Sequence, residues 1–400
     1  MKPALPRFGE FVALVALLMS LTALATDAML PALQTIGHDL GVVHENDAQL
    51  IISALFFGLG LGQMIFGTLS DALGRKPLMF LGFLLFILGS VLSALAVNFE
   101  QMLFGRLLQG LGAAAPRVLT LALVRDCYSG RAMAQIMSFA MSVFVLVPML
   151  APSLGQSVLL ITDWRGIFEA LSLLAVGIMV WFGWRMPETL HNEDRHSLTW
   201  EHFFSSAKRV LFNTTAMRYT VTTGVIFGAF TGYLNSVQQV LQIQYGLGER
   251  FPLYFAFLAL GIGAASFVNA KLVMHFGMHK ISRFAITWFM ALTSLFFVFV
   301  WQTAGNPPLY GLLAYFLFSF FGLGLLFGNL NALAMQPLGH DAGIGASVVG
   351  SLSTFIAIPL GAFIGQSYNG TVLPLISGFG LLGIIATVLI FIKDKPDTTV

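Results

Sequence analysis

Charge is scarce in this sequence of 400 residues: Asp, Glu, Lys and Arg together make up 10% of it. A typical soluble domain has about 25% charged residues, so a soluble globular protein is excluded. Hydrophobic residues make up 57% of the chain, and the mean hydropathy is +0.84. They occur in repeated runs of about twenty residues, the length that a helix needs to cross a bilayer. The composition therefore predicts an all-α protein with many spans in the lipid bilayer.

Cysteine is almost absent, and the motifs of several other protein classes do not occur. The single cysteine, Cys127, excludes an intrachain disulfide. Without a G-x-x-x-x-G-K-[ST] phosphate loop, ATP is not expected to drive the protein, and neither H-E-x-x-H nor G-x-S-x-G is present. The polar residues between His38 and Asp47 match no metal-ligand spacing. We expect no enzyme activity, no cofactor, no metal site and no nucleic-acid partner.

Apolar runs separated by charged residues, proline or glycine predict twelve membrane-spanning helices. Cytoplasmic loops retain Lys and Arg, and sixteen of the 20 basic residues fall on one side of this arrangement. Both termini are therefore predicted to be cytoplasmic. The predicted spans are 10–33, 49–70, 77–97, 101–124, 133–160, 165–186, 217–241, 252–274, 280–301, 308–335, 342–368 and 371–392.

The two halves of the chain echo each other. The segment GTLSDALGRK at 67–76 follows the second predicted span, and a weaker counterpart, AKLVMHFGMHK at 270–280, follows the eighth. Gly74 and Gly277 occupy matching places in these segments. Two repeated halves predict a transporter whose site lies at their interface, and they disfavour a channel or a receptor.

A long polar segment, 187–216, separates the two halves. It is predicted to be a cytoplasmic linker that contains a short amphipathic helix. The domain organisation that follows is an N-terminal six-helix bundle at 1–186 and a C-terminal six-helix bundle at 217–400.

The segment GTLSDALGRKP at 67–77 resembles the signature loop of the major facilitator superfamily, G-x-L-a-D-x-x-G-R-[KR]-[PR], with Ser70 as the one replacement. Further segments are similar to the bicyclomycin-resistance (Bcr/CflA) family of drug:proton antiporters. The resemblance implies the major facilitator fold and drug efflux by a monomer in the bacterial inner membrane, driven by the proton motive force. These segments are TDAMLPAL at 26–33, GRLLQGLGAAAPRV at 105–118, LVRDCY at 123–128, MSFAMSVFVLVPMLAPSLGQ at 137–156 and ETL at 188–190.

The signature loop places charge between two apolar runs. Its basic residues fit a topological anchor, but that explanation leaves Asp71 and the two glycines without a role. The resemblance implies a cytoplasmic gate in which Asp71 faces the start of the eleventh span and Arg75 pairs with Asp126. The helix dipole favours a carboxylate near a helix N-terminus. The implied gate residues are Gly67, Asp71, Gly74, Arg75, Lys76 and Asp126.

Asp27 and Arg106 are ionisable residues inside predicted spans, at similar depth in the external half of the membrane. Intramembrane charges are costly and indicate function. Burial favours a protonated acid and a nearby cation favours the carboxylate, so Asp27 is expected to exchange a proton near neutral pH. The resemblance implies a role in proton coupling for both residues. The alternative is a structural ion pair that neutralises both charges.

Arg117 departs from the family, which usually has an uncharged residue at this position. It follows Arg106 by eleven residues, so both side chains belong to one stripe of a helix. One interpretation is a substrate pocket that prefers an anionic or zwitterionic group. The other is an arginine that snorkels to the cytoplasmic interface beside Arg125.

Pro148, Pro152 and Gly155 lie inside the fifth predicted span, where proline kinks a helix and glycine allows close approach. The resemblance implies the antiporter motif of exporters, although Val147 and Gln156 depart from that motif. The alternative is a kink that faces lipid. Uncharged polar residues inside the spans are candidates for substrate binding or for contacts between helices. They are Gln63, Asn235, Gln238, Asn329 and Asn331.

Together these features predict a transporter that exports small amphipathic drugs or metabolites from the cytoplasm in exchange for protons. The alternative is a proton-coupled importer or a dedicated metabolite exporter of the same fold. A membrane-embedded enzyme would need catalytic residues clustered at one depth, and the sequence shows none.

Overall fold

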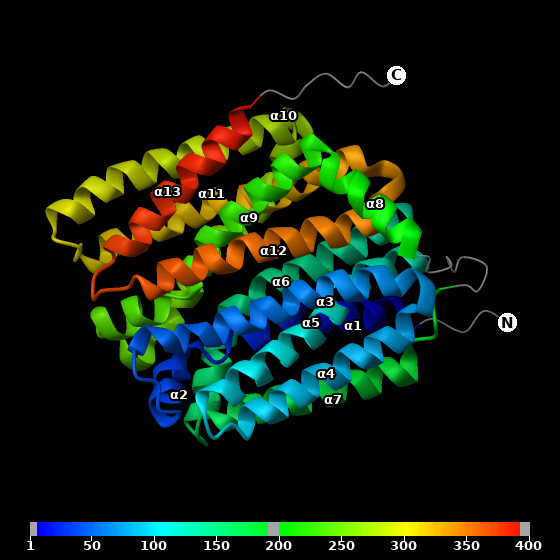
Figure 1. Cartoon of the computed structure of the whole chain (residues 1–400), viewed down its shortest axis with the longest axis horizontal. Coiled ribbons are helices and arrows are strands. Elements are labelled where there is room, and N and C mark those ends of the chain that lie inside the picture. Colours follow the sequence, from blue (N-terminus) through cyan, green and yellow to red (C-terminus); the bar gives the residue numbers. More distant parts are fainter. Residues whose placement is uncertain (1–5, 191–199, 393–400) are drawn as a thin grey trace. The chain divides into compact units, whose positions relative to one another are not determined.

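The computed structural model describes residues 6–190 and 200–392, and the regular structure in these ranges is helical throughout (Figure 1). The prediction of an all-α protein is confirmed. The α-helices are α1 (Phe8–Asp27), α2 (Leu33–Asp39), α3 (Leu50–Leu73), α4 (Arg75–Ala94), α5 (Phe99–Cys127), α6 (Gly130–Leu159), α7 (Arg165–Arg185), α8 (Trp200–Phe212), α9 (Thr214–Leu234), α10 (Phe251–Gln302), α11 (Leu309–Met335), α12 (Ala342–Gln366) and α13 (Leu373–Phe391). Short 3-10 helices are η1 (Leu30–Ala32), η2 (Glu45–Gln49), η5 (Gly248–Arg250) and η6 (Gln336–Asp341), and η4 (Gln238–Gln244) is a π-helix.

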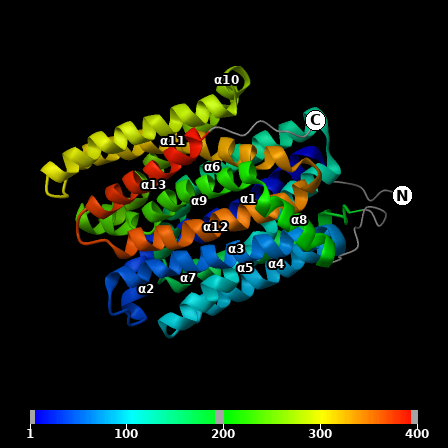
Figure 2. The same cartoon turned by 45° about the horizontal axis from the view of Figure 1, so that its top comes forward.

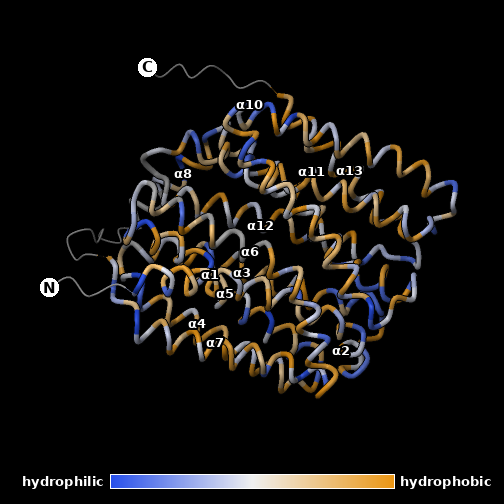
Figure 3. The backbone as a smooth tube through the Cα atoms, turned by 180° about the vertical axis from the view of Figure 1, so that it is seen from behind, coloured by the Kyte–Doolittle hydropathy of each residue, from blue (hydrophilic) through white to orange (hydrophobic). Residues whose placement is uncertain are grey.

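Many of the helices have the length and hydrophobicity of membrane-spanning helices. Within the described ranges, nine helical stretches are long and apolar enough to cross a bilayer. Hydrophobic residues predominate along these helices, and hydrophilic residues gather mainly toward their ends (Figure 3). Because water cannot satisfy backbone groups in hydrocarbon, long helices with internal hydrogen bonds are the stable way to span it. The prediction of a multi-pass membrane protein is confirmed.

The chain divides into two compact units. The first comprises Met1–Phe203 and Leu234–Ala259, and the second comprises Phe204–Tyr233 and Leu260–Val400. The segment that follows α9, including η4 and η5, therefore packs with the first unit. One boundary between the units lies in α8, within the polar linker. The other two lie at the end of α9 and inside α10.

In the first unit, α5 is the central helix, and α3 and α4 lie against it in both views (Figures 1 and 2). Glycines make this packing close. A Cβ on Gly58 of α3 would lie 1.9 Å from the carbonyl oxygen of Leu107, and one on Gly112 would lie 2.2 Å from the backbone nitrogen of Phe86 in α4. Small residues allow membrane helices to approach until their backbones touch. This close packing fixes the face of α5 that points into the unit.

In the second unit, α9 packs against α12 through glycines at four-residue spacing. A Cβ on Gly224 would lie 2.8 Å from Ile356 Cβ, and one on Gly228 would lie 2.9 Å from Leu360 Cβ. Residues four apart share one face of a helix, so these glycines form a groove for the branched side chains of α12.

The first predicted span, 10–33, is not one continuous helix. The α-helix ends at Asp27, and η1 and α2 continue the chain to Asp39. Pro31 explains the break, since proline lacks the N–H that would bond the carbonyl of Asp27 four residues earlier. The break places a carboxylate at the end of a helix instead of in its middle.

Gly74 and Gly277, which occupy matching places in the two halves of the sequence, also have similar backbone conformations. Gly74, between α3 and α4, has φ 99° and ψ 158°, and Gly277, at the break inside α10, has φ 75° and ψ 157°. This region is open to glycine almost alone. The break at Gly277 divides α10 into two helical segments, which correspond to the predicted spans 252–274 and 280–301.

Candidate functional site

Asp27 is buried at the end of α1, with 5% of its surface exposed. Its carboxylate makes no hydrogen bond or ion pair within residues 6–190 and 200–392. The preceding hydroxyl, Thr26 Oγ1, donates back to the carbonyl of Thr22 at 2.9 Å. An ionised carboxylate that is buried without a partner is costly, so this group is held where gaining or losing a proton changes the energy strongly.

Arg106 lies close to Asp27 in depth but does not pair with it. Its Nη2 donates to the carbonyl oxygen of Ala25 at 2.9 Å, and its Nε donates to that of Ile51 at 3.4 Å. Its Nη1 donates to Oε1 of Gln109, and Gln109 Nε2 donates in turn to Ser90 Oγ at 2.8 Å. The side chain is fully buried. The structure therefore contains no Asp27–Arg106 ion pair, and the arginine caps the last turn of α1, where a cation is favoured.

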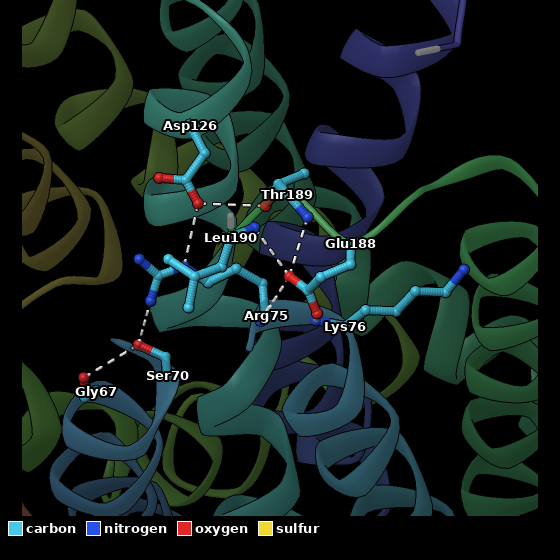
Figure 4. Close-up of polar contacts among 8 residues, drawn as sticks. All are labelled: Gly67, Ser70, Arg75, Lys76, Asp126, Glu188, Thr189 and Leu190. Atoms are coloured by element: carbon cyan, nitrogen blue, oxygen red, sulfur yellow. Dashed lines mark hydrogen bonds and ion pairs between the residues drawn. The ribbon is translucent and has the colours of Figure 1, made fainter. Parts of the chain in front are cut away.

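Arg75 is the centre of a polar cluster in the first unit (Figure 4). It is buried, with 2% of its surface exposed. Its Nε donates to Asp126 Oδ2 at 3.1 Å, and its Nη1 donates to Ser70 Oγ at 2.6 Å. Ser70 Oγ donates in turn to the carbonyl of Gly67 at 3.1 Å. The pair of Arg75 and Asp126 that the resemblance implies is present, and it joins the start of α4 to the end of α5.

Glu188 is a member of this cluster that the sequence did not single out as a site residue. Its Oε1 and Oε2 accept the backbone N–H groups of Arg75 and Lys76, both at 3.0 Å. Oε1 also accepts the N–H groups of Thr189, at 2.9 Å, and Leu190, at 3.0 Å. The carboxylate therefore caps the N-terminus of α4, where four N–H groups lack partners inside the helix. The only signal for it was the segment ETL, which carried no assigned role.

Three further hydrogen bonds complete the Arg75 cluster, which we define as Ser70, Arg75, Lys76, Asp126, Glu188 and Thr189. Thr189 Oγ1 donates to Asp126 Oδ2 at 3.2 Å. Lys76 Nζ donates to the carbonyls of Gly183, at 2.9 Å, and Met186, at 2.6 Å, at the end of α7. The side chain of Asp71, a predicted gate residue, lies outside the described part of the structure. The cluster fastens the ends of α3, α4, α5 and α7 to each other.

The prolines and the glycine of the predicted antiporter motif lie in α6. Pro152 is buried and Pro148 is half-buried. Gly155 approaches the chain directly after Asp27, since a Cβ at this position would lie 1.7 Å from the carbonyl oxygen of Ala28. α6 therefore packs on the break that follows α1, and Gly155 makes this possible.

The uncharged polar candidates are spread over both units. Gln63 is buried in α3, with 5% of its surface exposed. In the first unit, Asn235 Nδ2 donates to Ser53 Oγ at 3.3 Å, and Gln238 Nε2 donates to Gln242 Oε1 at 3.0 Å. In the second unit, Asn329 and Asn331 belong to α11.

The two asparagines of α11 differ in surroundings. Asn329 Nδ2 donates to Asn269 Oδ1 at 2.7 Å and to the carbonyl of Leu325 at 2.8 Å, and Asn331 is exposed. The Asn329–Asn269 contact joins α11 to α10, which is the role of a polar contact between membrane helices.

A contact that the sequence did not predict joins η4 to η2. Gln239 Nε2 donates to Asn46 Oδ1 at 2.7 Å, and both belong to the first unit. Asn235 Nδ2 and Ser53 Oγ make a second polar contact between the same stretches of chain. The run of amides from Asn235 to Gln244 was the available signal. The π-helix that carries them is a form found often at functional sites.

Arg117 lies in α5, on the stripe that also contains Arg106. It is half-buried, and within the described ranges its guanidinium makes no hydrogen bond or ion pair. The two arginines of one helix therefore differ: the first donates to three oxygens, and the second keeps its donors available.

Comparison with known proteins agrees with this architecture. The family model described as Major Facilitator Superfamily matches residues 15–362. An uncharacterized MFS-type transporter, YdgK, of Bacillus subtilis (strain 168) is 29% identical over 355 residues, which cover 88% of this chain and 87% of the relative. A bicyclomycin resistance protein homolog of Haemophilus influenzae is 25% identical over 391 residues, which cover 94% of each chain.

The fold is also that of solved transporters. The xylose transporter XylE from E. coli, in a partially occluded inward open conformation, aligns with a TM-score of 0.73 at 12% identity, over 98% of this chain and 99% of that chain. At this identity the likeness shows the fold alone. With the family model matching most of its length, this chain belongs to the Major Facilitator Superfamily and is a transporter, not an enzyme.

Proposed function

We propose that this protein is a proton-coupled antiporter that exports small amphipathic drugs or metabolites across the bacterial inner membrane. The similarity to a bicyclomycin resistance protein homolog supports drug efflux. In this proposal the chain works as a monomer with twelve spans and cytoplasmic termini, and the proton motive force replaces any cofactor. The six-helix halves 1–186 and 217–400, joined by the linker 187–216, rock about a central cavity.

The observation that carries the proposal is the state of Asp27. It is a carboxylate buried in a membrane helix with no described partner. Cargo and a proton compete for this group, so that loading one releases the other. Arg106 holds the last turn of α1 through the carbonyl of Ala25 and so positions Asp27. Because Gly155 packs on Ala28, a movement of α6 also moves the chain next to Asp27.

The energy of one proton is sufficient for useful export. A proton that moves inward through about 100 mV supplies about 2.3 kcal/mol, which corresponds to about fifty-fold accumulation of a neutral cargo. The Arg75 cluster serves as part of the cytoplasmic gate in this scheme, because it holds the signature loop at the ends of α3 and α4 in place. Asp71 is assigned to the same gate by its place in the signature loop.

The alternative is a proton-coupled importer or a dedicated metabolite exporter of the same fold. It is favoured by one observation, the departure of Val147 and Gln156 from the antiporter motif of exporters. The direction of counterflow in vesicles of known orientation separates it from drug efflux.

The experiment that tests the proposal compares wild type with Asp27→Asn and with Glu249→Gln, an exposed acid in η5, as the matched control. Proteoliposomes with an imposed pH gradient are offered bicyclomycin, naphthalene-2-carboxylate and ethidium, and uptake and proton flux are recorded. We expect gradient-driven accumulation to be lost in Asp27→Asn and kept in Glu249→Gln, with cargo-driven proton release lost in the first. Accumulation and proton flux that survive Asp27→Asn would remove Asp27 from the coupling step.

A further inference from the structure

We infer that Arg117 binds the anionic group of the cargo, such as a carboxylate, phosphate or sulfonate, and so sets a preference for anionic and zwitterionic molecules. This inference rests on the proposed function only in that the chain carries a small molecule. It deepens that function by naming a substrate class.

Arg117 lies on the same face of α5 as Arg106. Eleven residues after Arg106, it returns to the same side of the helix within about 20°. Thr22 Oγ1 of α1 donates to the carbonyl of Ala113 at 3.2 Å, so this side of α5 faces α1. Phe104, 59% exposed, lies on the other side, toward the lipid. Arg117 therefore lies on the side of α5 that packs on α1, away from Phe104.

The exposed fraction of the side chains varies along this stripe. Gly110, Ala113, Thr120 and Val124 are buried, as is Arg106, whereas Arg117 is half-buried. Arg117 is therefore more accessible than these residues. Leu121, one turn later and about 40° around the helix, is 47% exposed, so the stripe opens at this level. A charge inside a span is stable where it meets water or an opposite charge, and open space supplies room for either.

The guanidinium of Arg117 has unused hydrogen-bonding capacity. Arginine has five N–H donors in a planar fork that matches a carboxylate or a phosphate. Arg106 directs its donors to Ala25, Ile51 and Gln109, but Arg117 makes no hydrogen bond or ion pair to the described residues. A fork without protein partners is free to receive an anion from outside.

Snorkelling does not explain Arg117. α5 ends at Cys127, ten residues later, which is about 15 Å of helix. This rise exceeds the length of an arginine side chain. Moreover, side chains in an α-helix lean toward its N-terminus, so that of Arg117 leans away from the Cys127 end. Arg125, which is exposed near that end, is the residue placed to snorkel.

The test uses an isosteric series that differs in charge: naphthalene-2-carboxylate, naphthalene-2-carboxamide and naphthalene-2-carboxamidine. Binding to the purified full chain in lipid nanodiscs is measured by titration calorimetry without a proton gradient. The variants are Arg117→Gln, Arg117→Lys and, as a matched control on the same helix, Arg125→Gln. Lysine keeps the charge but loses the fork, so it separates charge from geometry.

We expect wild type to bind the carboxylate more tightly than the amide and the amidine. Arg117→Gln should weaken carboxylate binding about ten- to hundredfold, the range for losing hydrogen bonds to a charged group. The same variant should change amide binding by no more than about twofold. The carboxylate affinity of Arg117→Lys should lie between those of wild type and Arg117→Gln. Arg125→Gln should bind all three compounds as wild type does. The inference is overturned if wild type binds the three alike, if the preference survives Arg117→Gln, or if that variant weakens all three equally.

The outcome is separable from that of the proposed function. Binding is measured at equilibrium, so a failure of gradient-driven transport in the Asp27 experiment does not affect it. Conversely, gradient-driven export of ethidium by a chain that shows no anion preference would support antiport and reject the role of Arg117.

Discussion

The backbone N–H of Arg75 donates to Oε1 of Glu188 at 3.0 Å, across 113 residues of chain. Through the other oxygen, Glu188 also receives the N–H of Lys76. Glu188, which follows α7, therefore caps α4, whose first residues belong to the signature loop. Glu188 is the second residue of the linker 187–216, so the Arg75 cluster is tied to the linker as well as to α5.

The first prediction concerns this cap. Glu188→Ala should lower the free energy of unfolding by about 0.5–2 kcal/mol, the range for losing a helix N-cap, because two N–H groups of α4 lose their acceptor. Glu249→Ala, in exposed η5, is the control and should change little. Unfolding in detergent, followed by tryptophan fluorescence, measures the difference. Equal stability of the two variants would contradict the capping role.

The second prediction compares Gly74 and Gly277, which share a backbone conformation open to glycine almost alone. Gly→Ala should cost about 1–3 kcal/mol of backbone strain at either position. At Gly74 the new Cβ would also lie 2.7 Å from Glu188 Oε2, whereas nothing lies within 4 Å at Gly277. Gly74→Ala should therefore lower the melting temperature more than Gly277→Ala. The reverse order in a thermal scan would show that the Glu188 contact does not matter.

The third prediction concerns Gly155, whose missing side chain lets α6 touch the carbonyl of Ala28. Gly155→Ala should force the two segments apart, at a cost of about 1–3 kcal/mol for overpacking, and move Asp27. Gly177→Ala in α7 is the matched control, because nothing lies within 4 Å of a Cβ there. Gradient-driven transport in proteoliposomes should fall in the first variant and not in the second. Wild-type transport by Gly155→Ala would separate α6 from the coupling site.

The fourth prediction contrasts the two arginines of α5. Arg106→Leu should destabilise the protein, because it removes the donors that satisfy the carbonyls of Ala25 and Ile51. Arg117→Leu should leave stability unchanged or raise it, since it removes an intramembrane charge without a described partner. Thermal unfolding of purified variants in the same detergent measures both effects. Equal losses in the two variants would indicate that Arg117 has structural partners.

Several parts of this site could be predicted from the sequence because their signals are local. The family resemblance implied the pair of Arg75 and Asp126, and the distance of 3.1 Å between their side chains agrees with it. Asp27, Arg106 and Arg117 stood out because charge inside an apolar run is rare. Their roles in transport stay predictions, and so do the number of spans and the side on which the termini lie.

Other parts could not be predicted because their partners are backbone groups or lie far away in the sequence. Arg106 was expected near Asp27, but it donates to backbone carbonyls, and every residue has one. Glu188 and Gln239 depend on contacts with residues more than a hundred positions away, which no local pattern contains. The close approach of Gly155 to Ala28 likewise depends on how two helices cross.

The sequence by itself determined that this chain is a helical membrane transporter of a known superfamily, because hydrophobic run length and short motifs are properties of neighbouring residues. Only the tertiary structure decided which charged side chains have hydrogen-bond partners and which do not. Hydrogen bonds over a few ångströms depend on how distant segments pack, and that packing leaves Asp27 and Arg117 without described partners while it satisfies Arg106 and Arg75.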